Sequence, residues 1–393
     1  MSDNTWSAAT LGSCVSILSG GTPSKSNPSF WNGSVPWVTA KDMKVLRLHD
    51  TEDHVSEEAI LSGTRVVEAG VPLVLVRGMT LHHDVPIVTP TVPMAFNQDV
   101  KALVPHSAVQ SQFLTYWLLA HRDVLLGLVD SASHGTGRIN TNQLASLPLR
   151  LPPQDEQRAI AGVLGALDDK IELNRRMNET LDRLAELQFA RLNAEAPTTW
   201  PDASIADLAD YINGRNFTKD ASGTGRMVIR IAELNSGPGP STVYANTAAP
   251  DEHIARADDI LFAWSGSLGV YRWRGAEALV NQHIFKVIPR VPAWFVYRHL
   301  RRAMPDFREI AADKATTMGH IKRGHLAGVT LKLPPAAVLD DVSALIEPLD
   351  QKIAANDAES RTLADLRDAL LPKLISGELR VRDLEGLGHS AAH

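Results

Sequence analysis

Cysteine is almost absent from this chain of 393 residues, which contains only Cys14. A single cysteine excludes an internal disulfide framework and any metal site built from a cysteine cluster, and it fits a reducing compartment. Long apolar runs are also missing, since no segment approaches the roughly 18 apolar residues of a membrane span. The N-terminus lacks the basic region that opens a secretion signal. The sequence therefore predicts a cytoplasmic protein that does not enter a membrane.

Complete nucleotide-binding signatures are absent as well. The stretch GGTPSKS at residues 20–26 resembles the end of a phosphate-binding loop, but Ser24 occupies the place of the glycine required before the lysine. The runs Gly135-Thr-Gly137 and Gly223-Thr-Gly225 lack the third glycine of a dinucleotide fingerprint. We interpret both runs as turns.

One group of residues has the composition of a metal site, namely His82 and His83 beside Asp84. No further ligand follows at helical or hairpin spacing, so an ordinary loop is favoured. The sequence therefore predicts no metal in this chain.

An internal repeat organises the sequence. Residues 137–153 (GRINTNQLASLPLRLPP) align without a gap on residues 319–335 (GHIKRGHLAGVTLKLPP), at an offset of 182 positions. Upstream the repeat is looser, with residues 97–105 over residues 281–289. A duplication whose tails match better than its heads predicts a shared scaffold that carries two different globular parts.

The tail of each half has the pattern of a long amphipathic helix. Apolar residues recur at three- and four-residue spacing through residues 154–192, which would form a rod of roughly 58 Å. The second tail repeats the pattern from Val342 to Leu370, where we expect Pro348 to kink or restart the first turns. Such rods need a partner helix to cover their apolar faces.

The head of each half is predicted to be mixed α/β. Short β-rich runs at residues 71–76, 259–263 and 284–288 are separated by loops rich in Gly, Pro, Ser and Asn. Helical patterns lie near residues 113–126 and 294–304. The expected fold is therefore α/β (α+β), with two globular domains, two long antiparallel helices that form a coiled-coil spacer, and an internal pseudo-twofold repeat.

Several motifs resemble the specificity subunits of type I restriction-modification enzymes. Residues 20–24 (GGTPS) and 31–43 (WNGSVPWVTAKDM) resemble the start of a target-recognition domain in that family. The runs LPPQDEQ at 151–157 and LLPKLISGEL at 370–379 carry the same resemblance, which covers essentially the whole chain in the family's order. The second helix departs from it, because AAVLD at 336–340 replaces the QDEQ run.

The resemblance implies four segments. These are target-recognition domain 1 (1–152), a central conserved helix (153–197), target-recognition domain 2 (198–334), and a C-terminal conserved helix with its tail (335–393). Each domain would read one part of a split double-stranded DNA site, and the helices would space the two domains and dock two methyltransferase subunits. A rigid spacer fixes the separation and angular phase of two readers on the duplex.

The distribution of charge fits this organisation better than the net charge of −6 does. Residues 198–334 carry +4, whereas residues 151–197 and 335–393 carry −3 and −5. The acid is therefore concentrated in the expected helices, and the second globular part is basic, as phosphate neutralisation requires. Residues 1–150 carry −2, so that part must rely on local clusters of basic residues.

Candidate DNA contacts are polar and basic residues, because base edges and phosphates are read by such side chains. In the first domain they are Lys41, Lys44, Arg77, His82 and Arg138. In the second domain they are Arg215, Asn216, Lys219, Arg230, Arg272, Arg274, Lys322 and Arg323. For each of them, a solvated surface group is the more common role of such a residue.

The run Arg272-Trp273-Arg274 is the strongest of these candidates. An aromatic residue between two guanidinium groups suits stacking and phosphate binding together. The alternative is an exposed strand with Trp273 facing the core, and the sequence leaves both open.

Helix pairing and partner docking are expected to use one apolar seam. Its candidate residues are Ile160, Leu164, Leu167, Ile171, Leu181, Leu349, Ile353 and Leu363. Asn174 and Asn356 occupy equivalent repeat positions inside this seam, where a buried polar pair would fix helix register at some cost in stability. Asparagines that face solvent are an equal alternative.

No catalytic centre is expected in this chain. It lacks the Asn-Pro-Pro-aromatic motif of adenine methyltransferases and the Glu-x-Lys of the usual restriction nuclease core. The resemblance implies that S-adenosylmethionine, ATP and Mg²⁺ are bound by methyltransferase and restriction subunits. Two alternatives stay open, a non-catalytic coiled-coil interaction scaffold and an enzyme with an unrecognised site. Salt-sensitive DNA binding would exclude the scaffold, and failure to cleave DNA with magnesium would exclude a nuclease.

Overall fold

The computed structural model describes residues 6–131, 135–312 and 320–383. The chain forms two compact units, of which unit 1 comprises residues 1–170 and 363–393 and unit 2 comprises residues 171–362. Two helices of 41 residues, α6 (Gln154–Ala194) and α10 (Ala336–Ser376), contribute to both units. In the described ranges, every helix is too short or too polar to cross a membrane.

Unit 1 contains four small sheets and several short helices. Its five-stranded sheet has the order β2 (Val15–Ser19), β11 (Val100–Pro105), β7 (Leu73–Leu75), β9 (Ile87–Pro90) and β4 (Arg47–Leu48). Its four-stranded sheet has the order β5 (His54–Val55), β3 (Val35–Val38), β10 (Met94–Phe96) and β6 (Arg65–Val67). Its smaller sheets are β12 (Val129–Ser131), β13 (Gly137–Ile139) and β8 (Arg77–Gly78), and the pair β1 (Ser7–Thr10) and β14 (Pro148–Leu151).

The helices of unit 1 connect and cover these sheets. They are α1 (Leu11–Cys14), η1 (Pro28–Trp31), α2 (Glu57–Leu61), η2 (Met79–His82), α3 (Ser111–Ala120), α4 (Arg122–Gly127) and α5 (Thr141–Ala145). Helix α3 is buried on nearly all sides, and its Phe113 and Trp117 join one core with Ile160 and Leu164 of α6. Burial of each such side chain contributes about 1.5–3 kcal/mol.

Unit 2 repeats the plan of unit 1 with different strands. One sheet has the order β16 (Ala209–Asn213), β23 (Ile284–Pro289), β20 (Ile260–Ala263) and β21 (Gly269–Arg272). A second has the order β18 (Tyr244–Ala245), β17 (Ala221–Ile229), β22 (Ala278–Val280) and β19 (Ile254–Ala255). The pair β15 (Asp202–Ser204) and β24 (Thr330–Lys332) is the counterpart of β1 and β14.

The helices of unit 2 are short except for one. They are η4 (Ile205–Leu208), η5 (Phe217–Asp220), α7 (Ile231–Ser236), η6 (Asp251–His253), α8 (Ala293–Ala312) and α9 (Arg323–Ala327). Helix α8 buries Phe295 and Leu300 in a core with Phe189 of α6 and Ile346 of α10. Each unit therefore has its own core, which is closed by the long helices.

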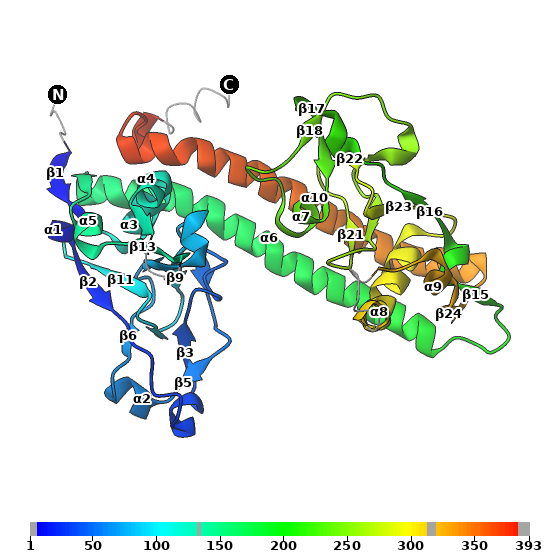
Figure 1. The fold of residues 1–393 in the computed structure, drawn as a ribbon, viewed down its shortest axis with the longest axis horizontal. Coiled ribbons are helices and arrows are strands. Elements are labelled where there is room, and N and C mark those ends of the chain that lie inside the picture. The colour runs from blue at the N-terminus through cyan, green and yellow to red at the C-terminus, as the bar shows by residue number, and fades with distance from the viewer. Residues whose placement is uncertain (1–5, 132–134, 313–319, 384–393) are drawn as a thin grey trace. The chain divides into compact units, whose positions relative to one another are not determined.

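The long helices pair antiparallel, as the sequence predicts (Figure 1). In unit 2, Asn174 contacts Ser360 while Asn178, one turn later, contacts Asp357. In unit 1, Glu156 contacts Arg380, and the later residue Asp168 contacts the earlier residue Arg367. These pairs show the same antiparallel direction. The mixed α/β fold and the coiled pairing of two long helices are thus confirmed.

Two local predictions were wrong. Pro348 does not restart the helix, because α10 continues through it from Ala336 to Ser376. Its side chain is exposed, so the ring and the unbonded carbonyl one turn earlier face solvent instead of the core. The single helical pattern near residues 113–126 is two helices, α3 and α4, that meet at His121.

Candidate nucleic-acid interface

Two arginines of unit 1 face each other across a strand pair. Strand β8 pairs antiparallel with β13, and this register places Arg77 directly opposite Arg138. Both side chains are exposed, and neither guanidinium has a hydrogen bond or ion pair within the described part of the chain. Like charges directly opposite each other destabilise a sheet, so the pair favours an external anion or acceptor.

The third strand of this sheet adds a carboxylate to the same face. Asp130 of β12 lies directly opposite Arg138 of β13, and its side chain is exposed. Side chains of directly opposite residues project on one face of a sheet. Asp130, Arg138 and Arg77 therefore form a row, which we call the charged row.

The charged row faces away from the core of unit 1. Its neighbour Gly137 points to the other face, where an added Cβ would lie 2.7 Å from Cβ of Leu81 and 2.9 Å from Cγ1 of Val129. Glycine at this position lets β13 pack closely on η2. The side of β13 on which Gly137 lies therefore faces η2, and the opposite side faces solvent. The alternation of a strand then turns Arg138 to solvent.

Two further basic groups lie near the charged row. Burial lowers the pKa of Lys101, and the charge of Arg138 lowers it further. The ammonium group of Lys101 donates a hydrogen bond to the hydroxyl of Ser19. His82 Nε2 lies 2.6 Å from the main-chain oxygen of Gly135, two residues before β13, and therefore donates to it. The structure thus brings Arg77, His82 and Arg138 to the same three-stranded sheet and its neighbouring turn.

The two predicted lysines of the first domain lie elsewhere. The ammonium group of Lys41 lies 2.9 Å from Asp53 and 3.0 Å from Glu52, and the hydrogen bonds that it donates to these carboxylates raise its pKa. Lys44 is exposed and lines a cavity with Asp84 and Arg122. Whether either lysine contacts DNA stays a prediction.

Unit 2 has a counterpart of the β8–β13 pairing, with different side chains. Ser265 and His320 form an antiparallel bridge, and Ile321 N donates to Trp264 O at 2.8 Å. In unit 1, Ile139 N donates in the same way to Val76 O at 2.9 Å. His320 of unit 2 is therefore equivalent to Arg138 of unit 1, and Ser265 is equivalent to Arg77.

An aromatic cluster surrounds this bridge in unit 2. The ring of Trp264 lies 5.7 Å from His283 and 6.2 Å from His320, measured between centroids. Phe285 lies 5.7 Å from the same indole. The equivalent surface is therefore charged in unit 1 and rich in rings in unit 2.

Other predicted residues of the second domain lie on strands and turns next to this cluster. Arg215 and Lys219 are exposed, and the backbone of Arg215 forms a bridge with Asn281, two residues before His283. Asn216 accepts a hydrogen bond from Thr218. Lys322 is exposed at the start of α9. The adjacent Arg323 donates to Tyr211 O of β16 at 2.8 Å.

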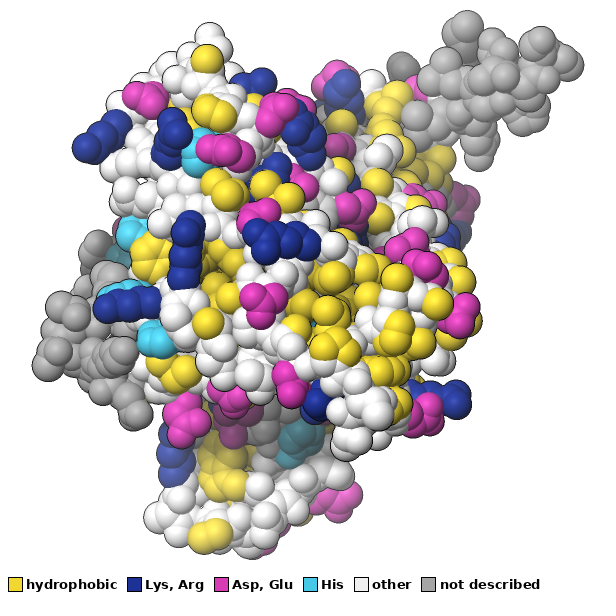
Figure 2. Space-filling model, turned by 90° about the vertical axis from the view of Figure 1, so that its right-hand side faces the viewer, with side chains coloured by type: hydrophobic (Ala, Val, Ile, Leu, Met, Phe, Trp, Pro, Cys, Tyr) yellow, Lys and Arg dark blue, Asp and Glu magenta, His cyan; other side chains and the backbone are white. Residues whose placement is uncertain are grey.

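The surface of the molecule shows where basic charge is not offset. On the face drawn in Figure 2, Lys, Arg and His side chains lie side by side at the left, whereas basic and acidic side chains alternate at the top. Only clusters of the first kind leave positive charge available to a polyanion.

Three arginines of the prediction are engaged inside unit 2. Arg230 forms an ion pair with the buried Glu233 at the start of α7. Arg272 lies 2.9 Å from Asp350 of α10, and Arg274 pairs with Asp258 and lies 3.4 Å from Asp357. These contacts hold β21 and the residues after it against α10, and they do not support a role in contacting DNA.

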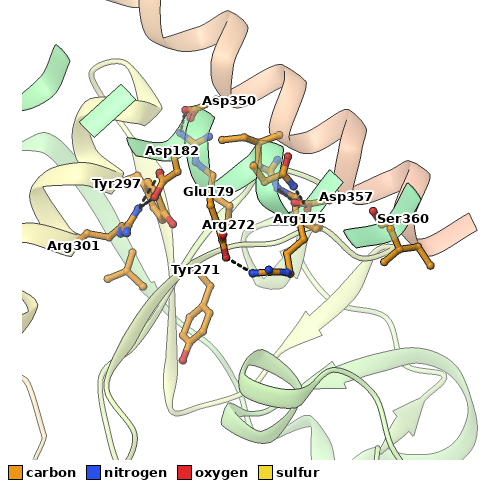
Figure 3. A pocket seen from close by; sticks show the side chains of 15 residues that line it. Arg175, Glu179, Asp182, Tyr271, Arg272, Tyr297, Arg301, Asp350, Asp357 and Ser360 are labelled. Carbon is orange, nitrogen blue, oxygen red and sulfur yellow. Dashed lines mark hydrogen bonds and ion pairs between the residues drawn. The ribbon is translucent and has the colours of Figure 1, made fainter. Parts of the chain in front are cut away.

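The packing of Trp273 decides between the two interpretations of the Arg-Trp-Arg run. Its side chain is buried in a core with Ile229 and Leu261, and its indole N–H donates to Ala276 O at 2.8 Å. The strand therefore turns its tryptophan to the core. Arg272 lines a cavity of about 730 Å³ with Arg175, Tyr297 and Asp350 (Figure 3).

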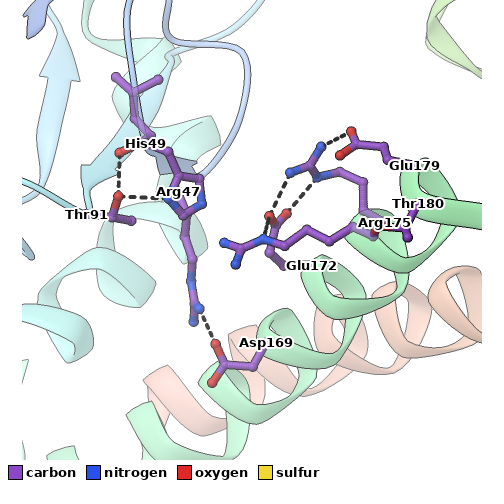
Figure 4. Close-up of polar contacts among 10 residues, drawn as sticks. Arg47, His49, Thr91, Asp169, Glu172, Arg175, Glu179 and Thr180 are labelled. Carbon is purple, nitrogen blue, oxygen red and sulfur yellow. Dashed lines mark hydrogen bonds and ion pairs between the residues drawn. The ribbon is translucent and has the colours of Figure 1, made fainter. Parts of the chain in front are cut away.

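The globular part of unit 1 rests on the long helices through a buried carboxylate, that of Asp168. In unit 1, Tyr116 of α3 donates its hydroxyl to Asp168 at 2.6 Å, and Arg367 of α10 donates to the same carboxylate at 2.8 Å. Burial and the charge of Asp168 raise the pKa of Tyr116, so this donor keeps its proton. Arg47 of β4 adds an ion pair to Asp169 (Figure 4).

The corresponding anchor of unit 2 is an arginine. Arg298 of α8 has a fully buried side chain that lies 3.0 Å from Glu186, 3.2 Å from Asp182 and 3.5 Å from Asp350. A separate network on α6 joins Glu172 to Arg175, which also pairs with Glu179 (Figure 4). Hydrogen bonds from Arg175 and then Arg176 lower the pKa of Glu172 to about 2.

The asparagines of the helix seam are both buried. Asn174 Nδ2 lies 2.9 Å from Glu359 Oε2 and 3.4 Å from the main-chain oxygen of Asn356, while Asn356 donates to Asn178 at 2.8 Å. Asparagines that face solvent are therefore excluded, whereas their role in register stays a prediction.

The apolar seam residues differ in burial. Ile160 and Leu164 are buried, and the others, which are Leu167, Ile171, Leu181, Leu349, Ile353 and Leu363, are half-buried. Leu173, Leu184 and Leu187 of α6 instead expose 53%, 45% and 58% of their surface, which is unusual for leucines of a paired helix. These three residues, which we call the α6 leucines, offer an apolar surface to a partner.

Sequence reasoning missed several residues of these surfaces. Asp130, Lys101, Trp264, His283 and His320 belong to them but fit no motif. The repeat offset alone could have matched His320 with Arg138. Among the described residues, no group of His, Cys, Asp and Glu is arranged to hold a metal ion.

Comparison with known proteins agrees with this organisation. Residues 3–183 and 197–361 match the family described as type I restriction modification DNA specificity domain. The chain is 25% identical to the type I restriction enzyme MjaIX specificity subunit of Methanocaldococcus jannaschii, across 96% of this chain and 94% of that protein. It is 32% identical to the EcoR124I/EcoR124II specificity subunit of Escherichia coli, across 46% of this chain and 44% of that protein.

A solved structure has a similar fold. The type I restriction-modification S subunit from M. genitalium aligns with a TM-score of 0.57 at 15% sequence identity. The alignment covers 95% of this chain and 97% of that one. At this identity the likeness concerns the fold.

Proposed function

The chain belongs to the type I restriction-modification DNA specificity family, and from that premise we propose how its parts share the work of target recognition. Each unit reads one half of a bipartite duplex site. The paired helices α6 and α10 space the two readers and dock two methyltransferase subunits, and restriction subunits join the same complex.

One observation carries the proposal for unit 1. Arg77 and Arg138 lie opposite each other on an exposed strand pair without a carboxylate bound to either guanidinium among the described residues. A protein that bound no polyanion would gain stability by replacing one of them. Two guanidinium groups placed opposite each other at a cost in stability fit a DNA-reading surface.

Unit 2 would use the cluster of Trp264, His283 and His320 together with the exposed Arg215 and Lys322. Rings supply flat contacts to sugars and bases, and the flanking cations hold phosphate. The different chemistry at equivalent positions would give the two half-sites different sequences.

The α6 leucines support docking of a partner. Exposed leucines on a long helix are costly in water and are buried when a partner covers them. A protein that served only as an interaction scaffold would also expose such leucines. A measurement of DNA binding must therefore distinguish the specificity subunit from the scaffold.

Catalysis is assigned to the partner subunits. Specificity subunits are the non-catalytic members of these complexes, and S-adenosylmethionine, ATP and Mg²⁺ would be bound by the methyltransferase and restriction subunits. This chain would supply only the position of the target adenine in each half-site.

Salt dependence tests the proposal. The chain would be purified with its methyltransferase subunit, and binding to a genomic duplex would be measured between 50 and 200 mM salt. Specific binding should weaken by orders of magnitude over this range, and Lys322→Ala should lower the salt slope by about one. Binding that ignores salt, or no binding at all, would favour the interaction scaffold.

A further inference from the structure

We infer that the charged row (Asp130, Arg138 and Arg77) reads the major-groove edge of a G·C base pair in the half-site of unit 1. This inference rests on the proposed function and adds to it the base pair and the residues that recognise it.

The order of groups in the row matches the edge of this base pair. Guanine presents two acceptors, N7 and O6, and a guanidinium donates to both, while the cytosine amino group donates to a carboxylate. Arg138 lies between Asp130 and Arg77 on adjacent strands of one sheet. A carboxylate beside two guanidinium groups therefore offers one acceptor for cytosine and paired donors for guanine.

The same carboxylate argues against a row that only holds phosphate. Asp130 is exposed and lies directly opposite Arg138. A phosphate bound to Arg138 would be repelled by this carboxylate at close range. A base-pair edge, which combines acceptors with a donor, fits both charges.

The sheet that carries the row is also accessible to the groove. A two-stranded β-ribbon can enter the major groove of B-form DNA. Arg77 and Arg138 are both exposed on the face that carries the row, so their guanidinium groups are open to a groove. Lys101, close to Arg138, is placed to hold a flanking phosphate.

The equivalent place in unit 2 supplies an internal comparison. There the bridge joins Ser265 to His320, so no guanidinium occupies the position of either arginine. The half-site of unit 2 should therefore not depend on guanine N7 through these positions.

A base analogue tests the inference on the complex of this chain with its methyltransferase subunit. The duplex carries the motif found by mapping methylated adenines, and each guanine in turn is replaced by 7-deazaguanine, which keeps base pairing but lacks N7. One guanine should prove sensitive, with about 5- to 150-fold weaker binding. In the Arg138→Ala complex, the same analogue should no longer change affinity.

Matched variants separate base reading from a charge effect. Arg138→Lys keeps the charge but loses the two-pronged donor, so it should bind as poorly at the motif as Arg138→Ala. Asp130→Ala should relax discrimination at the same base pair. Arg65→Ala, which removes an exposed arginine of β6, should leave binding unchanged.

Each outcome has one meaning. If no guanine is sensitive, or if Arg138→Ala weakens binding to the motif and to unrelated duplexes alike while Arg138→Lys restores it, the row holds phosphate and the inference is wrong. If the unaltered complex does not prefer the motif to unrelated DNA, the proposed function itself fails.

Discussion

Asp168 and Asp350 occupy the same position in the two halves of the chain and receive different partners. Asp168 accepts the hydroxyl of Tyr116 at 2.6 Å, whereas Asp350 pairs with Arg272 at 2.9 Å and lies 3.5 Å from Arg298. Tyr116 and Arg298 are themselves related by the repeat. The duplication has thus kept a carboxylate on each long helix, buried at Asp168 and half-buried at Asp350, and changed the donor that the globular part offers to it.

Removal of the Tyr116 hydroxyl should weaken unit 1. In the Tyr116→Phe variant, Asp168 remains buried with Arg367 as its partner, so one lone pair loses its donor. We expect the free energy of unfolding to fall by about 1–3 kcal/mol, measured by urea denaturation. Tyr297→Phe, which keeps the ring beneath Arg272, serves as the control and should cost less than about 0.5 kcal/mol. Equal losses in the two variants would contradict the role of this hydrogen bond.

The stability of unit 2 should depend on pH through His299. Burial, followed by the charge of Arg302, lowers the pKa of this residue from 6.5 to about 4. The unfolded chain therefore takes up the proton first as pH falls. The contribution of His299 to stability should be constant above pH 6.5 and decline by about 3 kcal/mol between pH 6.5 and 4.

Denaturation of His299→Phe across this range checks the effect. The ring stays between Phe189 and Phe295, and the decline between pH 6.5 and 4 should become shallower than in the natural protein. His83→Gln, at an exposed position, should not alter the slope. Identical pH profiles for the natural protein and His299→Phe would refute the assignment.

The asparagines of the seam should specify register more than stability. Replacement of both Asn174 and Asn356 by leucine should leave stability unchanged or raise it, but allow the helices to slip. Register can be read by cysteines at positions 178 and 357, whose natural side chains are 2.7 Å apart. Oxidation should cross-link this pair efficiently with the asparagines and poorly with leucines. Equal yields would remove the register role.

The α6 leucines should determine assembly with the methyltransferase subunit. Replacement of Leu173, Leu184 and Leu187 by lysine puts charge on the proposed docking surface and should reduce co-purification at least tenfold. Leu61→Lys, at a leucine of α2 that is 89% exposed, is the control and should assemble normally. Normal assembly of the triple variant would place docking elsewhere.

The sequence predicted what local periodicity encodes. The three- and four-residue spacing identified α6 within two residues of its observed end at Ala194, and the repeat identified two globular parts. Pro348 misled because a proline on the solvent side of a helix costs less than one that faces the core. Propensity alone does not reveal which side a residue faces.

The surfaces were harder to predict because they depend on contacts between distant residues. Arg77 meets Arg138 only through a strand of two residues, which has no periodicity to detect. The Arg-Trp-Arg run suggested a DNA contact, but the partner of Arg272 is Asp350, 78 positions away. Basic residues look alike in sequence, and only the fold separates those with carboxylate partners from those without.

Genome-wide mapping of methylated adenines tests the central claim most directly. The chain would be expressed with the methyltransferase subunit encoded beside it, in a host without related enzymes. The account predicts a split motif with a fixed gap that disappears when this chain is omitted, and that changes in one half only when Arg77 and Arg138 are replaced. Methylation that is the same with and without the chain would contradict the account.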